Sequence, residues 1–145
     1  MIIKQTRDIS SPIYQHALDI RRFVFVEEQQ VPLELEIDDN EGKCIHFVLY
    51  ISEQTPVATL RILPDKDCKK VFIQLVATLQ SYRGCGYAAM LLTAALDFLK
   101  TQNITQVELH AQLQALTFYE KLGFKAFGSE FLDADIPHLA MKKII

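Results

Sequence analysis

Residues 71–99 read VFIQLVATLQSYRGCGYAAMLLTAALDFL, and the rest of the chain is organised around this stretch. Its first part, residues 71–79, is an apolar and partly β-branched run that is typical of a buried strand. Its last part, residues 88–99, carries apolar residues spaced to cover one face of a helix. Between them lies QSYRGCGYA, residues 80–88. The stretch therefore predicts a strand joined by a glycine-containing turn to an amphipathic helix.

The turn has the properties of an anion site. The first N–H groups of a helix have no partner inside the helix, and the helix dipole adds roughly half a positive charge there. Gly84 and Gly86 allow a ligand to approach the backbone closely, and Arg83 adds a permanent positive charge. We therefore expect a ligand that carries phosphate at this turn.

The spacing of the glycines distinguishes between classes of phosphate loop. The G-x-x-x-x-G-K-[ST] loop of nucleoside triphosphatases is missing, and so is the G-x-G-x-x-G dinucleotide fingerprint. The pattern present is Arg83-x-x-Gly86-x-Ala88. It resembles the pyrophosphate-binding signature of the GNAT superfamily of N-acyltransferases, Q/R-x-x-G-x-G/A.

Further segments resemble the same superfamily, in the expected order. Residues 115–124, ALTFYEKLGF, resemble its A-x-x-[LF]-Y-x-x-x-G-F segment. The N-terminal matches to its ElaA-like and YjcF-like branch are residues 21–32 (RRFVFVEEQQVP), Glu36, Asp38 and His46. Residues 130–131 and 136–141 resemble that branch too. The resemblance covers nearly the whole chain and implies a GNAT-like fold.

The periodicity of the sequence predicts an α/β protein with a mixed sheet flanked by helices. Strands are expected near residues 1–5, 44–51, 57–63, 71–79, 106–110, 125–128 and 138–144. Helices are expected from Ser11-Pro12 to about Val24, over 88–99 and over 113–122, with an acidic loop at 34–42 and a turn at 64–67. Short turns make the second, third and fourth strands an antiparallel meander. The strand–helix–strand connection makes 71–79 and 106–110 a parallel pair, which the resemblance expects to splay apart.

Length and composition indicate one domain over residues 1–145. A net charge of −3 gives no general nucleic-acid or membrane-surface signature, and no window predicts a signal peptide or a membrane span. Cys44, Cys68 and Cys85 cannot all pair with one another and have no metal-like spacing. We therefore expect a reduced, cytoplasmic protein without a metal, a nucleic-acid partner or a membrane partner. The resemblance also allows a homodimer.

The resemblance implies an enzyme that uses acetyl-CoA and moves the acetyl group to an amine of a small molecule or peptide, by direct attack on the thioester. Diverging strands expose unpaired N–H and C=O groups, with which the two amides of pantetheine can pair like a missing strand. The resemblance places the cofactor contacts at Val76, Ala77, Thr78, Arg83, Gly84, Cys85, Gly86, Tyr87, Ala88 and Gln112. Cys85 stands where a lysine or arginine is common, which removes one phosphate partner.

Three groups are needed for the transfer. The backbone N–H near Val76 is expected to stabilise the carbonyl oxygen, and Tyr119 is carried over from the family motif as the acid for the leaving thiolate. The expected acceptor contacts are Glu28, Glu36, Asp38 and His110. The acidic stretch allows two interpretations, a solvated loop or carboxylates that attract a cationic amine. His46 and His138 are expected to be structural, so the sequence does not identify the general base.

Two other classes of function remain open. One is a CoA-binding module without catalysis, which senses the acyl-CoA pool or acts as a scaffold, because no unique base stands out. The other is a plain nucleotide-binding domain. Transfer of acetyl groups to an amine distinguishes the first from an enzyme, and competition by desulfo-CoA but not by ATP distinguishes the second.

Overall fold

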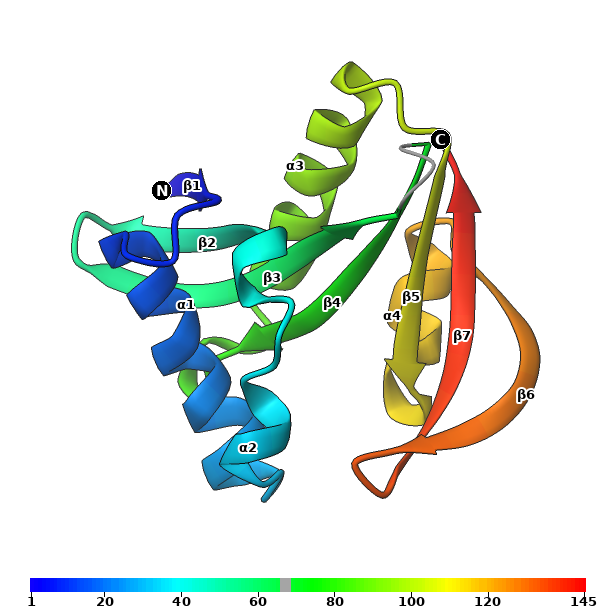
Figure 1. Cartoon of the computed structure of the whole chain (residues 1–145), viewed down its shortest axis with the longest axis horizontal. Coiled ribbons are helices and arrows are strands. Elements are labelled where there is room, and N and C mark those ends of the chain that lie inside the picture. The colour runs from blue at the N-terminus through cyan, green and yellow to red at the C-terminus, as the bar shows by residue number, and fades with distance from the viewer. Residues whose placement is uncertain (66–68) are drawn as a thin grey trace.

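The computed structural model describes residues 1–65 and 69–145, and its strands form a seven-stranded sheet in the order β1-β2-β3-β4-β5-β7-β6 (Figure 1). The strands are β1 (Ile2–Thr6), β2 (Ile45–Ser52), β3 (Thr55–Pro64), β4 (Lys70–Thr78), β5 (Gln106–Gln112), β6 (Lys125–Asp133) and β7 (Ile136–Ile144). The helices are α1 (Pro12–Arg21), the π-helix η1 (Arg22–Glu28), α2 (Leu33–Glu36), α3 (Tyr87–Thr101) and α4 (Leu116–Lys121), with 3₁₀ turns at Glu41–Lys43, Gln80–Tyr82 and Leu113–Ala115.

Neighbouring strands are antiparallel except for one pair. β2, β3 and β4 form an antiparallel meander. β4 and β5 run parallel, with Lys70–Ile73 beside Gln106–Leu109. β5 then pairs with β7 in antiparallel fashion along Gln106–Gln112. This arrangement confirms the predicted mixed sheet, its meander and its parallel pair.

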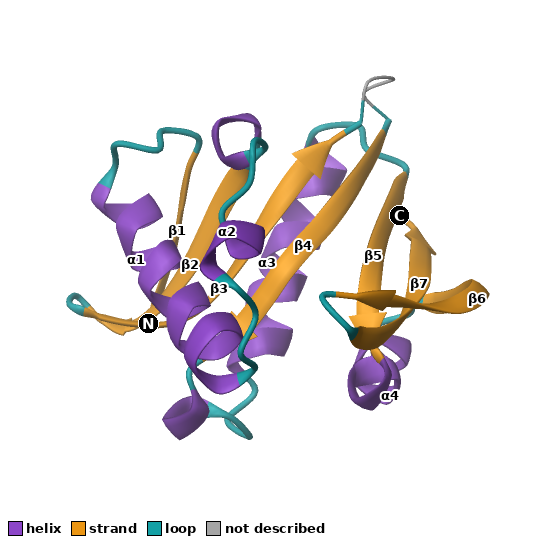
Figure 2. Ribbon diagram, turned by 60° about the horizontal axis from the view of Figure 1, so that its bottom comes forward, coloured by secondary structure: helices purple, strands orange, loops and turns teal. Residues whose placement is uncertain are grey.

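Helices cover both faces of the sheet, with α1 and α2 on one side and α3 on the other (Figure 2). Adjacent residues of a strand point to opposite faces, so Phe47 joins a hydrophobic cluster with Leu92 of α3, while Val48 joins one with Ile20 of α1. β2 is consequently buried at every position from Ile45 to Tyr50. Covering on both faces explains why the central strands are continuous apolar runs rather than alternating ones.

The expectation of a solvated acidic loop over residues 34–42 holds for Glu34, Asp38 and Asp39, which are exposed, but not for Glu36 and Glu41. The segment forms α2 and a 3₁₀ turn, and Glu36 and Glu41 are only 2% and 6% exposed. The reason is that Arg21 and Arg61 lie in the interior, where a guanidinium needs carboxylate partners to offset its loss of hydration.

Two boundaries near the C-terminus also differ from expectation. The predicted helix over 113–122 begins as a 3₁₀ turn, and its α-helical part starts at Leu116. β6 does not end at Gly128 but continues to Asp133. Gly128 adopts a φ of 75°, and the register with β7 shifts after Phe127, so the strand bends without ending.

The start of the first helix is confirmed. Pro12 occupies its first position, and the Ser11 hydroxyl accepts a hydrogen bond of 3.2 Å from the N–H of Ile13. Part of the turn predicted at 64–67, together with Cys68, falls outside the described residues.

Candidate active site

The site begins where β4 and β5 part. Their parallel pairing ends at Ile73 and Leu109, after which β4 stays with β3 as far as Thr78. Figure 1 shows the two strands close together near the C-terminus of the chain and diverging along their length. Within the described chain, the edge of β4 from Gln74 to Thr78 therefore has no strand beside it on the β5 side. We call this divergence the wedge.

A bulge in β4 sharpens the wedge. Leu75 adopts a φ of 54°, which is uncommon for a residue other than glycine. The register with β3 shifts here, because Gln74 pairs with Arg61 whereas Ala77 pairs with Thr59. The extra residue bends the strand away from β5 and re-aims the backbone groups of Val76.

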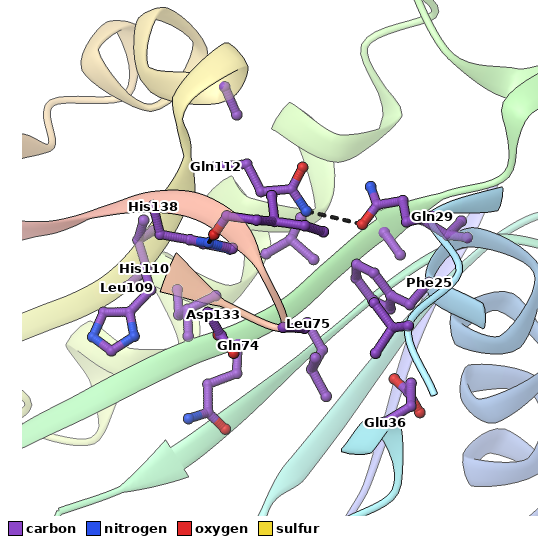
Figure 3. Close-up of a pocket in the computed structure, with 18 of the residues that line it drawn as sticks. Phe25, Gln29, Glu36, Gln74, Leu75, Leu109, His110, Gln112, Asp133 and His138 are labelled. Carbon is purple, nitrogen blue, oxygen red and sulfur yellow. Dashed lines mark hydrogen bonds between the residues drawn. The ribbon is translucent and has the colours of Figure 1, made fainter. Parts of the chain in front are cut away.

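A cavity of about 650 Å³ fills the wedge. On the side of the central sheet and of η1 it is lined by Val24, Phe25, Gln29, Val31, Leu35, Glu36, Asp38, Arg61, Phe72, Ile73, Arg83, Ala88 and the β4 residues Gln74, Leu75, Val76, Ala77 and Thr78. On the other side it is lined by Leu109, His110, Gln112, Gln114, Ala115, Tyr119, Asp133, Ala134, Ile136 and His138. Figure 3 shows Gln29 and Gln112 reaching toward each other from the two sides.

The glycine turn lies at the end of this cavity and leaves backbone donors free. Gly84 and Gly86 have φ values of 79° and 82°, which favour glycine, and a Cβ atom at either position would meet no atom within 4 Å. Among the described residues, no side chain caps α3 at Gly86. The N–H groups of its first turn are therefore available to a ligand.

Arg83 is held in place from two directions. Its Nε donates to the carbonyl oxygen of Thr78 at 3.0 Å, and its two terminal nitrogens donate to the carboxylate of Glu28 at 2.6 and 2.7 Å. These hydrogen bonds lower the pKa of Glu28. Glu28, expected to contact the acceptor, thus lies against Arg83 and is not part of the cavity lining.

Tyr119 lies in α4 and is 8% exposed. Its ring packs edge-on against Phe118 and Phe124, with centroids 5.1 and 6.0 Å away. Burial raises the pKa of its hydroxyl. Among the described residues this hydroxyl has no hydrogen-bond partner, and the residue lines the cavity. Tyr119 is therefore a neutral phenol that can donate a proton into the cavity.

An ion cluster, made of Arg21, Glu36, Asp38, Glu41 and Arg61, contributes three residues, Glu36, Asp38 and Arg61, to one wall of the cavity. Arg21 contacts Glu36 at 2.7 Å and Glu41 at 2.8 Å. Arg61 contacts Glu41 and Asp38, each at 2.7 Å. The hydrogen bonds from Arg61 lower the pKa of Asp38 to about 2. Of the expected acceptor residues, Glu36 is thus buried against Arg21, and Asp38, whose side chain is 39% exposed, is fixed by Arg61.

The C-terminal end of η1 bridges the wedge. The side-chain amide of Gln112 donates to the Gln29 oxygen at 3.0 Å, so adjacent residues Glu28 and Gln29 contact opposite sides of the site (Figure 3). A π-helix is rare and often marks functional sites, and here its wider turn extends the first helix to this position.

The three histidines near the site have different environments. His46 is fully buried and its Nε2 lies 2.8 Å from the carbonyl oxygen of Glu41, as expected for a structural histidine. His110 is exposed and lines the cavity from β5. His138 is 8% exposed and lines the cavity from β7, with its Nδ1 2.6 Å from the carbonyl oxygen of Ile136. Figure 3 shows His110 and His138 on the same side of the wedge.

The structure brings most of the expected residues together. Those that line the cavity are Val76, Ala77, Thr78, Arg83, Ala88, Gln112 and Tyr119 from the predicted cofactor and catalytic set, and Glu36, Asp38 and His110 from the predicted acceptor set. Gly84, Cys85, Gly86 and Tyr87 lie beside it in the turn and at the start of α3. Sequence reasoning missed Gln29, Arg21 and Arg61. Arg21 and Gln29 stand within residues 21–32, whose resemblance to the ElaA-like and YjcF-like branch was their sequence signal, whereas no motif marked Arg61.

Two absences apply to residues 1–65 and 69–145. No group of three or more His, Cys, Asp or Glu side chains there is arranged to hold a metal ion. No helix in that part of the chain is long and apolar enough to cross a membrane.

Comparison with known proteins places the chain in a family. The acetyltransferase (GNAT) domain family matches residues 21–145. The uncharacterised N-acetyltransferase YjcF of Bacillus subtilis (strain 168) is 37% identical over 128 residues, which cover 88% of this chain and 89% of YjcF. The crystal structure of an acyl-CoA N-acyltransferase from Pseudomonas aeruginosa superposes with a TM-score of 0.86 at 26% identity, covering 99% of both chains. Escherichia coli ElaA superposes with a TM-score of 0.83 at 26% identity, covering 98% of this chain and 99% of ElaA. This chain therefore belongs to the GNAT acetyltransferase family, in the branch that contains YjcF and ElaA.

Proposed function

We propose that this protein transfers the acetyl group of acetyl-CoA to an amine of a small molecule or peptide. One observation carries the proposal: the open edge of β4, the uncapped start of α3 and the Tyr119 hydroxyl all border one cavity. The name of the P. aeruginosa relative, an acyl-CoA N-acyltransferase, supports a CoA thioester as donor.

In this proposal the cofactor lies along β4. The pantetheine amides pair with the backbone of Val76, Ala77 and Thr78, as an added strand would. The diphosphate rests on the N–H groups at residues 84–88, with Arg83 beside it. Gln112 contacts the pantetheine from the opposite wall. The residues present fit this ligand, because open space surrounds Gly84 and Gly86 and the first turn of α3 offers unused donors.

The chemistry follows from the same placement. The N–H of Val76 stabilises the negative charge that develops on the thioester oxygen, a contribution typically worth about 10²–10³ in rate. Tyr119 gives its proton to the departing thiolate, and acid catalysis of this kind contributes roughly 10²–10⁴. A phenol is protonated at neutral pH, and burial raises the pKa of Tyr119 further, so the proton is in place when the thiolate leaves.

The acceptor occupies the part of the cavity away from α3. There the ion cluster contributes Glu36 and Asp38 on one wall, and His110 stands on the other. The cluster holds three carboxylates against two guanidinium groups, so its excess charge is negative and attracts a cationic amine. Glu28 acts on Arg83 instead of on the acceptor.

Two measurements test the proposal. Calorimetry should detect binding of CoA, and a screen of amines that follows thiol release should find an acceptor. Gly86→Glu should weaken CoA binding by at least about 10²-fold, because it strains a left-handed position and sets a carboxylate beside the diphosphate. Thr93→Glu adds the same charge on the exposed face of α3 and should leave binding unchanged.

The outcomes separate the alternatives. Binding of CoA without transfer to any amine would favour a non-catalytic CoA-binding module. No binding of CoA, or equal binding by the Gly86→Glu variant, would overturn the proposed cofactor site.

A further inference from the structure

The proposed reaction needs a base, because an amine attacks a thioester only as its neutral form and amines in water are largely protonated at neutral pH. A base must reach the acceptor, so it lies among the side chains that line the cavity. The titratable ones on the acceptor side are Glu36, Asp38, His110, Asp133 and His138.

The two carboxylates of the ion cluster are already occupied. The oxygens of Glu36 accept hydrogen bonds of 2.7 and 3.0 Å from Arg21. Those of Asp38 accept bonds of 3.0 and 2.7 Å from Arg61, which lowers the pKa of Asp38 to about 2. Asp38 is therefore a weak base. Burial raises the pKa of Glu36, but both of its oxygens are turned to Arg21, so neither is free to take a proton from the acceptor.

His138 has the properties that a base requires. The carbonyl oxygen of Ile136 can only accept a hydrogen bond, so the Nδ1 atom 2.6 Å away carries the ring hydrogen. In the neutral ring, Nε2 then holds the free lone pair. Among the described residues Nε2 has no hydrogen-bond partner, although His138 is 8% exposed. The ring also stacks on Phe131, with centroids 5.9 Å apart and planes 24° apart, which fixes its orientation.

His110 lacks these constraints. It meets Phe131 edge-on, at 4.9 Å between centroids, and no hydrogen bond in the described part of the chain fixes which of its nitrogens carries the proton. It is also exposed. The groups that share the cavity with His138 are His110 from β5, Asp133 from β6, Tyr119 from α4, and Glu36 and Asp38 from the opposite wall.

The geometry points to His138 as the general base of the acyl transfer, an inference that rests on the proposed function. Nε2 of His138 takes one proton from the acceptor ammonium, and the neutral amine attacks the thioester carbon. As the tetrahedral intermediate collapses, the C–S bond breaks and Tyr119 gives its proton to the thiolate. The amide nitrogen loses its second proton, which restores Tyr119, and His138 releases the first proton to solvent.

The test compares His138→Gln with His16→Gln, a change to a histidine of α1 that lies outside the cavity lining, with an acceptor found in the amine screen. His138→Gln should lower kcat/KM by about 10²–10³ and remove the acidic limb of the kcat/KM profile, because glutamine does not titrate. The affinity for CoA, measured by calorimetry, should stay unchanged. His16→Gln should keep kcat/KM within about threefold of wild type and keep the limb. In a His138→Ala variant, added imidazole should restore part of the rate.

Two readouts keep a structural role separate from a catalytic one. If His138→Gln lost activity but retained the acidic limb, and imidazole did not rescue His138→Ala, the base would be another group. Long-range ¹H–¹⁵N spectra of the wild type should show the His138 hydrogen on Nδ1, and a hydrogen on Nε2 would overturn the assignment without any assay. Wild-type protein that acetylates no amine would overturn the proposed function and the base with it, whereas an active His138→Gln variant would overturn the base alone.

Discussion

In the proposed reaction Tyr119 acts through one atom, the hydroxyl oxygen, of an otherwise packed residue. Its ring lies between Phe118 and Phe124, as any core aromatic would, and only the hydroxyl distinguishes it from phenylalanine. That hydroxyl has no hydrogen-bond partner among the described residues, and the residue lines the cavity, so the hydroxyl is free to bind a ligand there. The residue therefore fits a role in the reaction better than a role in packing alone.

Tyr119→Phe tests this residue. We expect kcat to fall by about 10²-fold or more at saturating acetyl-CoA, because the thiolate loses its proton donor, while the KM for acetyl-CoA changes little. Because burial raises the pKa of Tyr119, the wild type should also keep its rate up to pH values above the ordinary range of a phenol. Initial rates across alkaline pH measure both effects.

Tyr50→Phe provides the control. It removes the same atom from a buried tyrosine whose hydroxyl lies 2.7 Å from Nδ1 of His16, outside the cavity lining. Unchanged turnover in Tyr119→Phe would mean that another group protonates the thiolate.

At the scale of elements, η1 connects the two sides of the site through neighbouring residues. Glu28 occupies Arg83, and Gln29 contacts Gln112. In the proposed complex Arg83 and Gln112, the partners of these two residues, both contact the cofactor. The negative charge of Glu28 therefore competes with the diphosphate for the same guanidinium group.

Glu28→Gln should consequently tighten CoA binding. The pair is exposed by 39% on the arginine and 33% on the glutamate, so removing the competing charge should gain about 0.5–1 kcal/mol, or roughly two- to fivefold in Kd. Calorimetry at low salt measures the change, and high salt should reduce it. Glu27→Gln removes the same charge from the neighbouring exposed position and should have no effect. Weaker binding by Glu28→Gln would mean that Glu28 orients Arg83 for the ligand instead.

At the scale of the whole molecule, the ion cluster ties the helical layer to the central sheet. Arg21 ends α1, Arg61 belongs to β3, and Glu41 contacts both of them. Removing one partner would leave a buried charge without a counter-charge. Substitutions in the cluster, and protonation of its carboxylates by acid, should therefore destabilise the fold.

The pKa of Asp38 sets the direction in which pH changes the stability of the fold. Its pKa is about 2 in the fold and near 3.8 when unpaired, so its carboxylate stabilises the fold above about pH 4 and loses that effect as the pH falls toward 2. Asp38→Asn should therefore be less stable than wild type at neutral pH, by about 1 kcal/mol or less since the aspartate is 39% exposed. Urea unfolding at a series of pH values should show this difference shrinking below about pH 4. A difference that stays constant down to about pH 3 would contradict the coupling to Arg61.

Local sequence patterns predict the helices, the strands and most of the site. They do not predict which charged side chains distant in sequence contact one another. Residues 71–99 indicate their strand, turn and helix because each signal is carried by near neighbours. The ion cluster joins Arg21 to Glu36 and Glu41, and nothing in the local sequence states which acid meets which base. For the same reason the sequence leaves two interpretations of the acidic stretch open, and the residues around His138 do not indicate that its Nε2 lacks a partner or that the residue lines a cavity.

The brevity of the contact between β4 and β5 has a mechanical consequence. Within the described residues the two strands pair only along Lys70–Ile73 and Gln106–Leu109, whereas one hydrophobic core continues beneath both of them, from Leu92 of α3 to Phe124. Beyond this short ladder, the position of Gln112 relative to Val76 is set by side-chain packing rather than by strand pairing. In the proposed enzyme, core substitutions under β5 should therefore change the width of the wedge, and with it the length of acyl chain that fits, while leaving the backbone of β4 in place.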